Sequence, residues 1–178
     1  ERKKTETRLQ YLAQHDQLTD LPNRELFHDR LCTALARARR DQQRLAVLYL
    51  DLDQFKPVND RHGHDIGDLL LRKVGARISQ CVRESDTVGR IGGDEFVVLL
   101  NDISLPEHAT AVAAKIHAAF EQPFELAGRL LQVSASIGIA IYPDHGEDDK
   151  QLLRHADDAM YGAKRQGGNR AVMTAVSP

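Results

Sequence analysis

Residues 87–100 have the sequence TVGRIGGDEFVVLL, and this stretch decides the fold. Two runs of strand-forming residues, 87–91 and 96–100, stand on either side of Gly92-Gly93-Asp94-Glu95. Apolar runs joined by a short glycine-containing turn are typical of a β-hairpin. We therefore expect a hairpin whose tip carries two glycines and two carboxylates.

The sequence around the hairpin places further elements in a definite order. Residues 45–50 are a nearly continuous apolar run, typical of a strand buried on both faces, and the run stops at Asp51-Leu52-Asp53. A polar loop is expected next. Apolar periodicity predicts helices over 26–38, 66–82, 109–120 and 152–163, and a strand over 131–142.

This order of strand, helix, hairpin, helix and strand is that of the ferredoxin-like β-α-β-β-α-β unit. In this α+β fold, helices back one face of an antiparallel sheet. Nucleotidyl-transfer palm domains use that sheet. The predicted architecture is therefore a ferredoxin-like palm domain with additional helices.

Composition narrows the class of protein. The 178 residues, 42% of them hydrophobic, suit one globular domain with a substantial core. The 24 basic and 26 acidic residues give a net charge of −2, which argues against a protein that holds nucleic acid by bulk charge. No apolar run approaches the roughly 18 residues of a membrane span, so we expect no membrane contact by this segment.

The cysteines and the first residues bear on the protein's setting. Cys32 and Cys81 both fall in apolar helical patterns, so neither a disulfide framework nor a cysteine-based zinc site is expected. A reducing, cytoplasmic setting fits best. The chain begins Glu1-Arg2-Lys3-Lys4 without Met, which predicts a piece of a longer protein. Whether that longer protein is anchored in a membrane stays open.

Acidic residues stand where the strand patterns end. Asp51 and Asp53 follow the first strand, and Asp94 and Glu95 lie in the hairpin turn. Because side chains alternate along a strand, carboxylates from two neighbouring strands could converge on one face. Oxygen ligands of this kind suit Mg²⁺ or Mn²⁺ together with a nucleoside triphosphate. An ordinary acidic turn beside unrelated surface acids explains the spacing equally well.

The segment 90–96 resembles the signature of the GGDEF domain family, the diguanylate cyclases that join two GTP into cyclic di-GMP. The resemblance runs from about residue 16 to residue 170 and implies a palm fold of the nucleotidyl cyclase type. The further matching motifs are DQLTDLPNR at 16–24, DLDQFK at 51–56, ND at 59–60, GHDIGD at 63–68, SIGIA at 136–140 and ADDAMYGAK at 156–164.

Carried over by position, the family pattern implies catalytic, metal-binding and GTP-binding residues. The guanine assignment is chemically sound, because a carboxylate accepts from guanine N1–H and N2–H₂, donors that adenine lacks. The implied catalytic acids are Asp94 and Glu95. The implied ligands of two Mg²⁺ or Mn²⁺ ions are Asp51, the Leu52 carbonyl, Asp94 and Glu95. The implied GTP-binding residues are Asn59 and Asp68 at guanine, Lys56, Lys164, Gln54 and Phe55 at the phosphates, and Gly92 and Gly93 at the hairpin tip.

One position departs from the family pattern. Family members often carry Arg four residues after the position of Lys164, where this chain has Gly168. Either Arg170 substitutes for that arginine, or one phosphate contact is lost and GTP binding is weakened.

The resemblance also implies assembly and feedback. Each domain binds one GTP, so two copies must face each other for catalysis and a lone monomer should be nearly inactive. Arg83 and Asp86 resemble the family's Arg-x-x-Asp inhibitory site for the product cyclic di-GMP, and Lys115 is the nearest match to its second basic residue. Without the family context, a surface ion pair is the better explanation of Arg83 and Asp86.

The implied division is a linker helix from an upstream domain at 1–14, a GGDEF catalytic domain at 15–173 and a tail at 174–178. A sensor and a phosphodiesterase are the expected linked domains. The main alternative to a cyclase is a GGDEF domain that binds GTP or cyclic di-GMP only to regulate such a neighbour. The acids favour catalysis, whereas Gly168 keeps the alternative open. A cyclase that makes a cyclic mononucleotide could share the palm, and product mass would separate the two.

Overall fold

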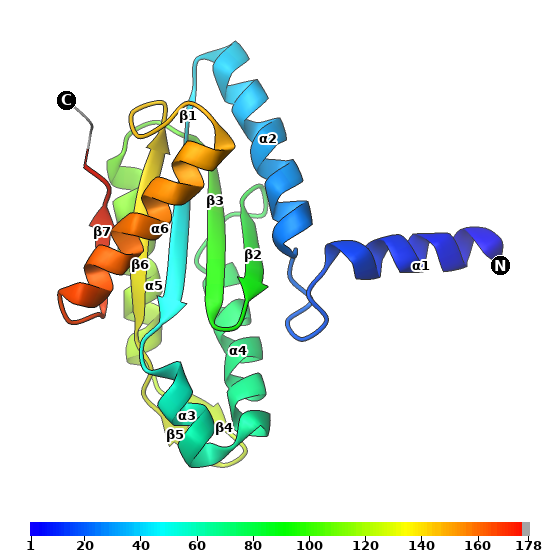
Figure 1. Cartoon of the computed structure of the whole chain (residues 1–178), viewed down its shortest axis with the longest axis vertical. Coiled ribbons are helices and arrows are strands. Elements are labelled where there is room, and N and C mark those ends of the chain that lie inside the picture. The colour runs from blue at the N-terminus through cyan, green and yellow to red at the C-terminus, as the bar shows by residue number, and fades with distance from the viewer. Residues whose placement is uncertain (176–178) are drawn as a thin grey trace.

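The chain, whose computed structural model describes residues 1–175, folds as a mixed sheet covered by helices on both faces (Figure 1). The helices are α1 (Arg2–Gln14), α2 (Arg24–Asp41), α3 (Phe55–His62), α4 (His64–Ser79), α5 (Glu107–Glu121) and α6 (Asp149–Arg165). The strands are β1 (Arg44–Leu52), β2 (Thr87–Gly92), β3 (Glu95–Ile103), β4 (Phe124–Leu126), β5 (Arg129–Leu131), β6 (Ala135–Tyr142) and β7 (Arg170–Met173).

The main sheet confirms the predicted ferredoxin-like palm. Its strand order within the described residues is β2-β3-β1-β6-β7, with β1 at the centre and antiparallel to both neighbours. The hairpin predicted at 87–100 is formed by β2 and β3. The sheet is not purely antiparallel, because β7 pairs parallel with β6 at the edge. The edge strand β7 and the strand β4 lie outside the predicted elements, and β5 overlaps them only at Leu131.

Helices cover both faces of the sheet, whereas the prediction placed them on one. On one face, α4 and α5 pack over alternate residues of β1, among them Leu48 and Leu50. On the other, α2 and α6 pack over Val47 and Tyr49. The apolar run of β1 is buried on both sides, as predicted, and each large aliphatic side chain buried in this way contributes about 1.5–3 kcal/mol.

Two predicted boundaries differ from the structure. The expected polar loop after β1 contains the helix α3, which meets α4 at Gly63, a residue with φ of +91°. A left-handed residue at the junction lets one helix end and the next begin at once. The strand predicted over 131–142 begins only at Ala135, and the preceding Ser134 carbonyl accepts a hydrogen bond from Asp53 N–H.

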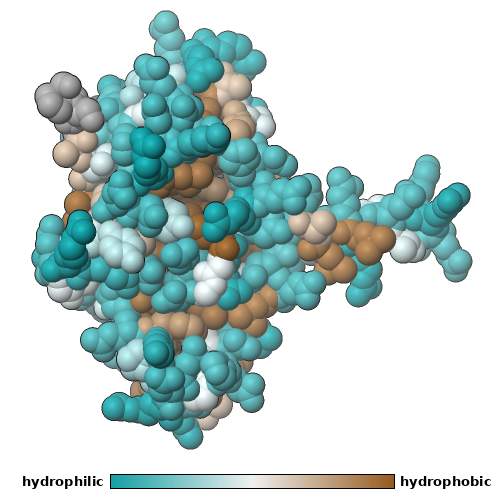
Figure 2. All heavy atoms as spheres, in the orientation of Figure 1, coloured by the Kyte–Doolittle hydropathy of each residue, from teal (hydrophilic) through white to brown (hydrophobic). Residues whose placement is uncertain are grey.

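The first helix projects from the body of the molecule (Figure 1). None of its residues is buried, and Leu9, Tyr11 and Leu12 are exposed. Hydrophobic atoms are visible where α1 meets the body (Figure 2). The expected linker segment 1–14 is helical from Arg2 to Gln14, but its linker role, and the division into 1–14, 15–173 and 174–178, stay predictions. Residues 176–178 of the expected tail lie outside the described residues. Within 1–175, every helix is too short or too polar to cross a membrane.

Candidate active site

The end of β1 and the β2–β3 hairpin bring three acidic side chains together. Asp51 is the direct cross-strand partner of Glu95, and the Leu52 N–H donates to the Asp94 carbonyl at 3.3 Å. The Asp94 carboxyl group is near enough to Asp51 to raise the pKa of Asp51. On the same sheet face, the Tyr49 hydroxyl donates to Glu95 Oε2 at 3.2 Å. The sheet register therefore gathers carboxylates from separate parts of the sequence.

The environment of Asp51 disfavours its negative charge. Burial and the neighbouring Asp94 carboxylate raise the pKa of Asp51 to about 6, although Lys164 acts in the opposite direction. A divalent cation would relieve this crowding of charge. The donors available are carboxylate oxygens and the Leu52 carbonyl, and an all-oxygen set fits Mg²⁺ or Mn²⁺.

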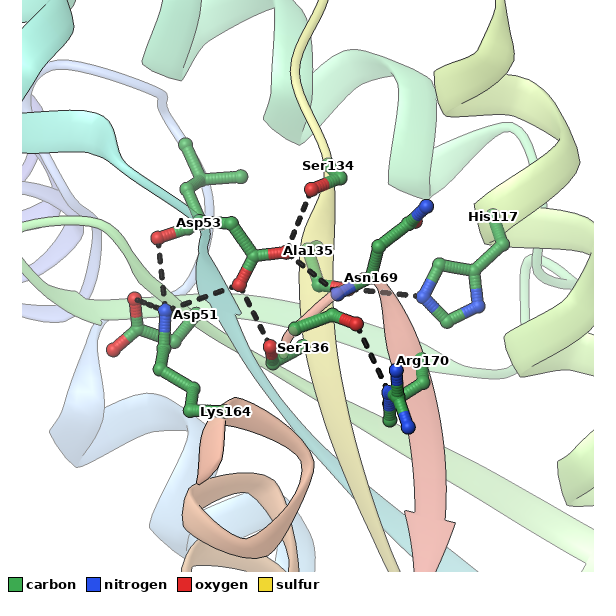
Figure 3. Close-up of polar contacts among 11 residues, drawn as sticks. Asp51, Asp53, His117, Ser134, Ala135, Ser136, Lys164, Asn169 and Arg170 are labelled. Carbon is green, nitrogen blue, oxygen red and sulfur yellow. Dashed lines mark hydrogen bonds and ion pairs between the residues drawn. The ribbon is translucent and has the colours of Figure 1, made fainter. Parts of the chain in front are cut away.

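Lys164 lies beside Asp51 and Asp53 (Figure 3). Its ammonium is 3.1 Å from Asp51 Oδ1, 3.3 Å from Asp53 Oδ1 and 3.1 Å from the Leu52 carbonyl oxygen. Burial acts to lower the pKa of Lys164, but the two carboxylates outweigh burial and raise it. The lysine is therefore a fixed positive charge beside the predicted metal ligands. Its role at a phosphate stays a prediction.

Asp53 makes different contacts from Asp51. Its carboxylate accepts hydrogen bonds from the Ser134 and Ser136 hydroxyls at 2.6 and 2.7 Å and from the Asn169 N–H at 2.8 Å (Figure 3). Burial acts to raise the pKa of Asp53, but these bonds and Lys164 hold it below its usual range. Asp53 thus ties the end of β1 to β6 and to the turn after α6, and it positions Lys164.

The departure at Gly168 has a structural counterpart. Gly168 is buried with φ of +74°, and a Cβ atom there would lie 2.9 Å from Asp53 Oδ1. A larger side chain would strain the backbone and displace the carboxylate. Arg170, the suggested substitute, donates to the Gly168 carbonyl and to Gln166 Oε1. Neither of these contacts involves the acids.

The predicted guanine-binding residues come from two adjoining helices. Asn59 lies on α3, and its side-chain oxygen is buried with no hydrogen-bond partner among the described residues. Asp68 is exposed on α4, next to Gly67. A Cβ atom at Gly67 would lie 1.8 Å from Asn59 Oδ1, so only glycine at position 67 leaves room for the Asn59 amide in this position. The Asn59 oxygen is therefore packed against Gly67, and its role at guanine stays a prediction.

The predicted phosphate-binding residues lie at the start of α3. Gln54 has φ of +56° and turns the chain from β1 into the helix, which begins at Phe55. Gln54 and Lys56 are exposed. The first N–H groups of a helix are free to bind an anion.

At the hairpin tip, Gly92 and Gly93 have φ of +156° and +45°, with open space where a Cβ atom would stand. Backbone conformation, rather than packing, therefore favours glycine at position 93.

A family model described as "Diguanylate cyclase, GGDEF domain" matches residues 13–170. The chain belongs to the GGDEF domain family. It is 50% identical over 158 residues to the bifunctional diguanylate cyclase/cyclic di-GMP phosphodiesterase MucR of Pseudomonas aeruginosa, covering 89% of this chain and 23% of MucR. It is 41% identical over 167 residues to the cyclic di-GMP phosphodiesterase PdeR of Escherichia coli, covering 94% of this chain and 25% of PdeR. The chain thus spans about a quarter of the length of these relatives.

Solved structures agree with this family assignment. The crystal structure of the GGDEF domain of TpbB from Pseudomonas aeruginosa matches with a TM-score of 0.88 and 43% sequence identity. The match covers 89% of this chain and 99% of that one.

In this GGDEF domain the predicted inhibitory residues lie far along β2 from the hairpin tip. Arg83 and Asp86 form an ion pair at 3.3 Å, just before the strand begins at Thr87. The Asp86 side chain is 2% exposed and accepts from the Asn101 N–H at 3.0 Å. Both residues and Lys115 line a cavity of about 420 Å³. The two residues form an ion pair beside a cavity, and their role as an inhibitory site stays a prediction.

Sequence reasoning missed a contact that holds the hairpin of this GGDEF domain. The Arg90 guanidinium donates to the Gly93 carbonyl at 2.9 and 2.8 Å and to Asp16 Oδ1 at 2.8 Å. Asp16 precedes α2, and 74 positions separate it from Arg90. Both residues belong to motifs that match the family, which is the signal that could have paired them.

Proposed function

We propose that this GGDEF domain is a diguanylate cyclase that condenses two GTP into cyclic di-GMP and releases pyrophosphate. The observation that carries the proposal is the meeting of Asp51, Asp94 and Glu95 with the Leu52 carbonyl at one end of the sheet. Within this group, burial and Asp94 raise the pKa of Asp51 to about 6. A bound cation would stabilise the ionised form of Asp51.

The four donors Asp51, Leu52, Asp94 and Glu95 would hold two Mg²⁺ or Mn²⁺ ions. When bound, such ions supply Lewis-acid chemistry, activating the 3′-hydroxyl of one GTP and stabilising charge at the α-phosphate of another. The Tyr49 hydroxyl orients the Glu95 carboxylate through its hydrogen bond.

The remaining predicted residues would bind and orient GTP. The β- and γ-phosphates would be held by Lys56, Lys164 and the backbone N–H groups at Gln54 and Phe55. At the hairpin tip, Gly92 and Gly93 would let the backbone approach the substrate closely. Asp68 would accept from guanine N1–H and N2–H₂, and the Asn59 amide would hydrogen-bond elsewhere on the ring. These contacts would favour guanine over adenine.

Catalysis by this mechanism needs a second copy of the domain. One domain holds one GTP, and the reaction joins two, so two sites must meet across a two-fold axis. The exposed Leu9, Tyr11 and Leu12 on α1 give the projecting helix an apolar surface for pairing. A linked sensor domain would then set the rate by changing how the two copies meet, in a protein whose catalytic part acts in the cytoplasm.

Product inhibition is proposed at Arg83, Asp86 and Lys115. A guanidinium can donate two parallel hydrogen bonds to a guanine edge or a phosphate. The Arg83 guanidinium donates to the Asp86 carboxylate and to the Asn101 carbonyl. Because the Arg83 side chain is also exposed, it would exchange these contacts for cyclic di-GMP.

The deciding experiment incubates nucleotide-free protein at high concentration with GTP and Mg²⁺ and identifies the products by mass. Cyclic di-GMP from the parent but not from Glu95→Gln is the expected result. Fusion to a strong dimeriser separates a catalytic failure from a failure to pair.

The second candidate function is a regulatory GTP-binding or cyclic di-GMP-binding module. It is favoured by Gly168, which occupies the position of a common family arginine, and by the similarity to PdeR, a phosphodiesterase. GTP binding without any product, even in the dimerised fusion, would make the regulatory function the correct one. A cyclic mononucleotide as the product would instead point to the related cyclase class.

A further inference from the structure

A second group of metal-ligating side chains lies between α2 and the start of α6, outside the acidic site. His28 and Cys32 are four residues apart on α2 and so share one face of the helix. Asp149 is the first residue of α6. His28 Nε2 is 2.6 Å from Asp149 Oδ2 and 3.7 Å from Cys32 Sγ, and the three ligand atoms all lie within 4.8 Å of one another.

These separations suit a small tetrahedral ion. With metal–ligand bonds of about 2.0–2.3 Å, ligand atoms in a tetrahedral zinc site lie roughly 3.3–3.7 Å apart. The His28–Cys32 separation already has this value, and the His28–Asp149 pair must open by less than an ångström or so. The His28 side chain is half exposed, so a ring rotation can supply that change.

We propose that His28, Cys32 and Asp149 form a Zn²⁺ site that joins α2 to α6. The fourth position would be open to water or to another ligand. A donor set of one sulfur, one imidazole nitrogen and one carboxylate oxygen suits zinc, whereas Mg²⁺ takes oxygen ligands. The site is therefore chemically distinct from the acidic group at Asp51 and does not depend on the proposed cyclase activity.

The local charges agree with cation binding. The hydrogen bond from His28 holds the pKa of Asp149 below its usual range, so the carboxylate is ionised at neutral pH. Burial, with the negative charges of Asp149 and Asp29, raises the pKa of the Cys32 thiol. The same negative charges attract a metal ion, and binding must release the thiol proton to the solvent.

The site would couple the two helices that cover one face of the sheet. His28 also lines a cavity of about 760 Å³, together with Tyr49, Gly92 and Asp157. Asp149 begins the helix that carries Lys164 toward its C-terminal end. A metal at this position would fix the spacing of α2 and α6 beside that cavity and stabilise the folded domain.

The test uses Co²⁺ as the spectroscopic probe on the whole chain in excess Mg²⁺, which occupies oxygen-only sites. We expect a thiolate-to-Co²⁺ charge-transfer band that saturates at a single equivalent and disappears when Zn²⁺ is added. Cys32→Ser should abolish the band, and Cys81→Ser, which alters a buried cysteine elsewhere, should leave it intact. A band that is missing from the parent, or that persists in Cys32→Ser, would overturn the proposal.

A thermal measurement tests the other two ligands. Zn²⁺ should raise the melting temperature of the parent, and His28→Ala and Asp149→Asn should each remove most of that rise. Because the comparison is made within each variant, with and without Zn²⁺, a general loss of stability does not imitate the result. An unchanged zinc effect in both variants would show that Cys32 binds metal without them and would reject the three-ligand site.

Discussion

Replacing Gly168 by Ala should destabilise the domain through both the backbone and a side-chain contact. At φ of +74° an L residue costs about 1–2 kcal/mol relative to glycine. The new Cβ atom would stand 2.9 Å from Asp53 Oδ1, so the carboxylate must move. That movement disturbs the hydrogen bonds from Ser134 and Ser136, and overpacking of this kind typically costs about 1 kcal/mol or more.

Together these effects amount to about 2 kcal/mol or more, which lowers the melting temperature of a chain of this size by at least about 4 °C. The assay is thermal unfolding followed by circular dichroism. The matched control is Gly162→Ala. Gly162 lies within α6 and has open space where a Cβ atom would stand, so alanine there should raise the melting temperature by about 1–4 °C.

The two variants are expected to shift the melting temperature in opposite directions. If Gly168→Ala melts at the parent temperature or above it, neither the left-handed backbone nor the Asp53 contact constrains this position. Gly168→Arg extends the test to the family's common residue. We expect it to be at least as unstable as Gly168→Ala, and a variant with parent stability would show that the turn accommodates arginine without displacing Asp53.

Three further predictions concern Asp51, Asp16 and the predicted guanine-binding residues. Burial beside a second carboxylate raises the pKa of Asp51 to about 6, so Asp51→Asn should raise the melting temperature of metal-free protein at pH 8 but not at pH 4. An equal gain at both values would contradict this. Burial acts to raise the pKa of Asp16, but its hydrogen bonds and the Arg90 guanidinium hold it below its usual range. Its stabilising effect is therefore present above about pH 4 and lost below, so the melting-temperature deficit of Asp16→Asn should shrink from pH 7 to pH 3; a constant deficit would count against the ion pair. Gly67→Ala should displace Asn59 and weaken GTP binding about fivefold by calorimetry, equivalent to one hydrogen bond of about 1 kcal/mol; unchanged affinity would remove Asn59 from the guanine site.

Much of the palm could be predicted from the sequence because its signals are local. The β1 run is apolar at nearly every position, and burial on both faces follows from that pattern. The glycines at 92 and 93 mark the hairpin turn between two apolar runs. Once strand order is known, the register places Asp51 opposite Glu95, so the convergence of acids also has a sequence basis.

Other contacts at the site carry no periodic signal. Asp53 shares its motif with Asp51, yet it is bound by the Ser134 and Ser136 hydroxyls, which are more than 80 positions away. Lys164 follows an ordinary helical pattern, and only the packing of α6 on the sheet brings its ammonium to the Leu52 carbonyl. Such side-chain pairings depend on tertiary packing, which periodicity does not encode.

The proposed zinc site is not expected from the cysteine count. Counting cysteines argues against a cysteine-based metal site, because Cys32 and Cys81 share no ligand spacing. His28 and Cys32 do have helical ligand spacing, but two ligands on one helix leave the site incomplete, and Asp149 is 121 positions from His28. The second helical layer over the sheet, absent from the one-face prediction, is what brings the third ligand to them. Packing of α2 against α6 therefore covers the second face of the sheet and also brings His28, Cys32 and Asp149 together. A variant that loosens this packing should weaken Zn²⁺ binding even with all three ligands present.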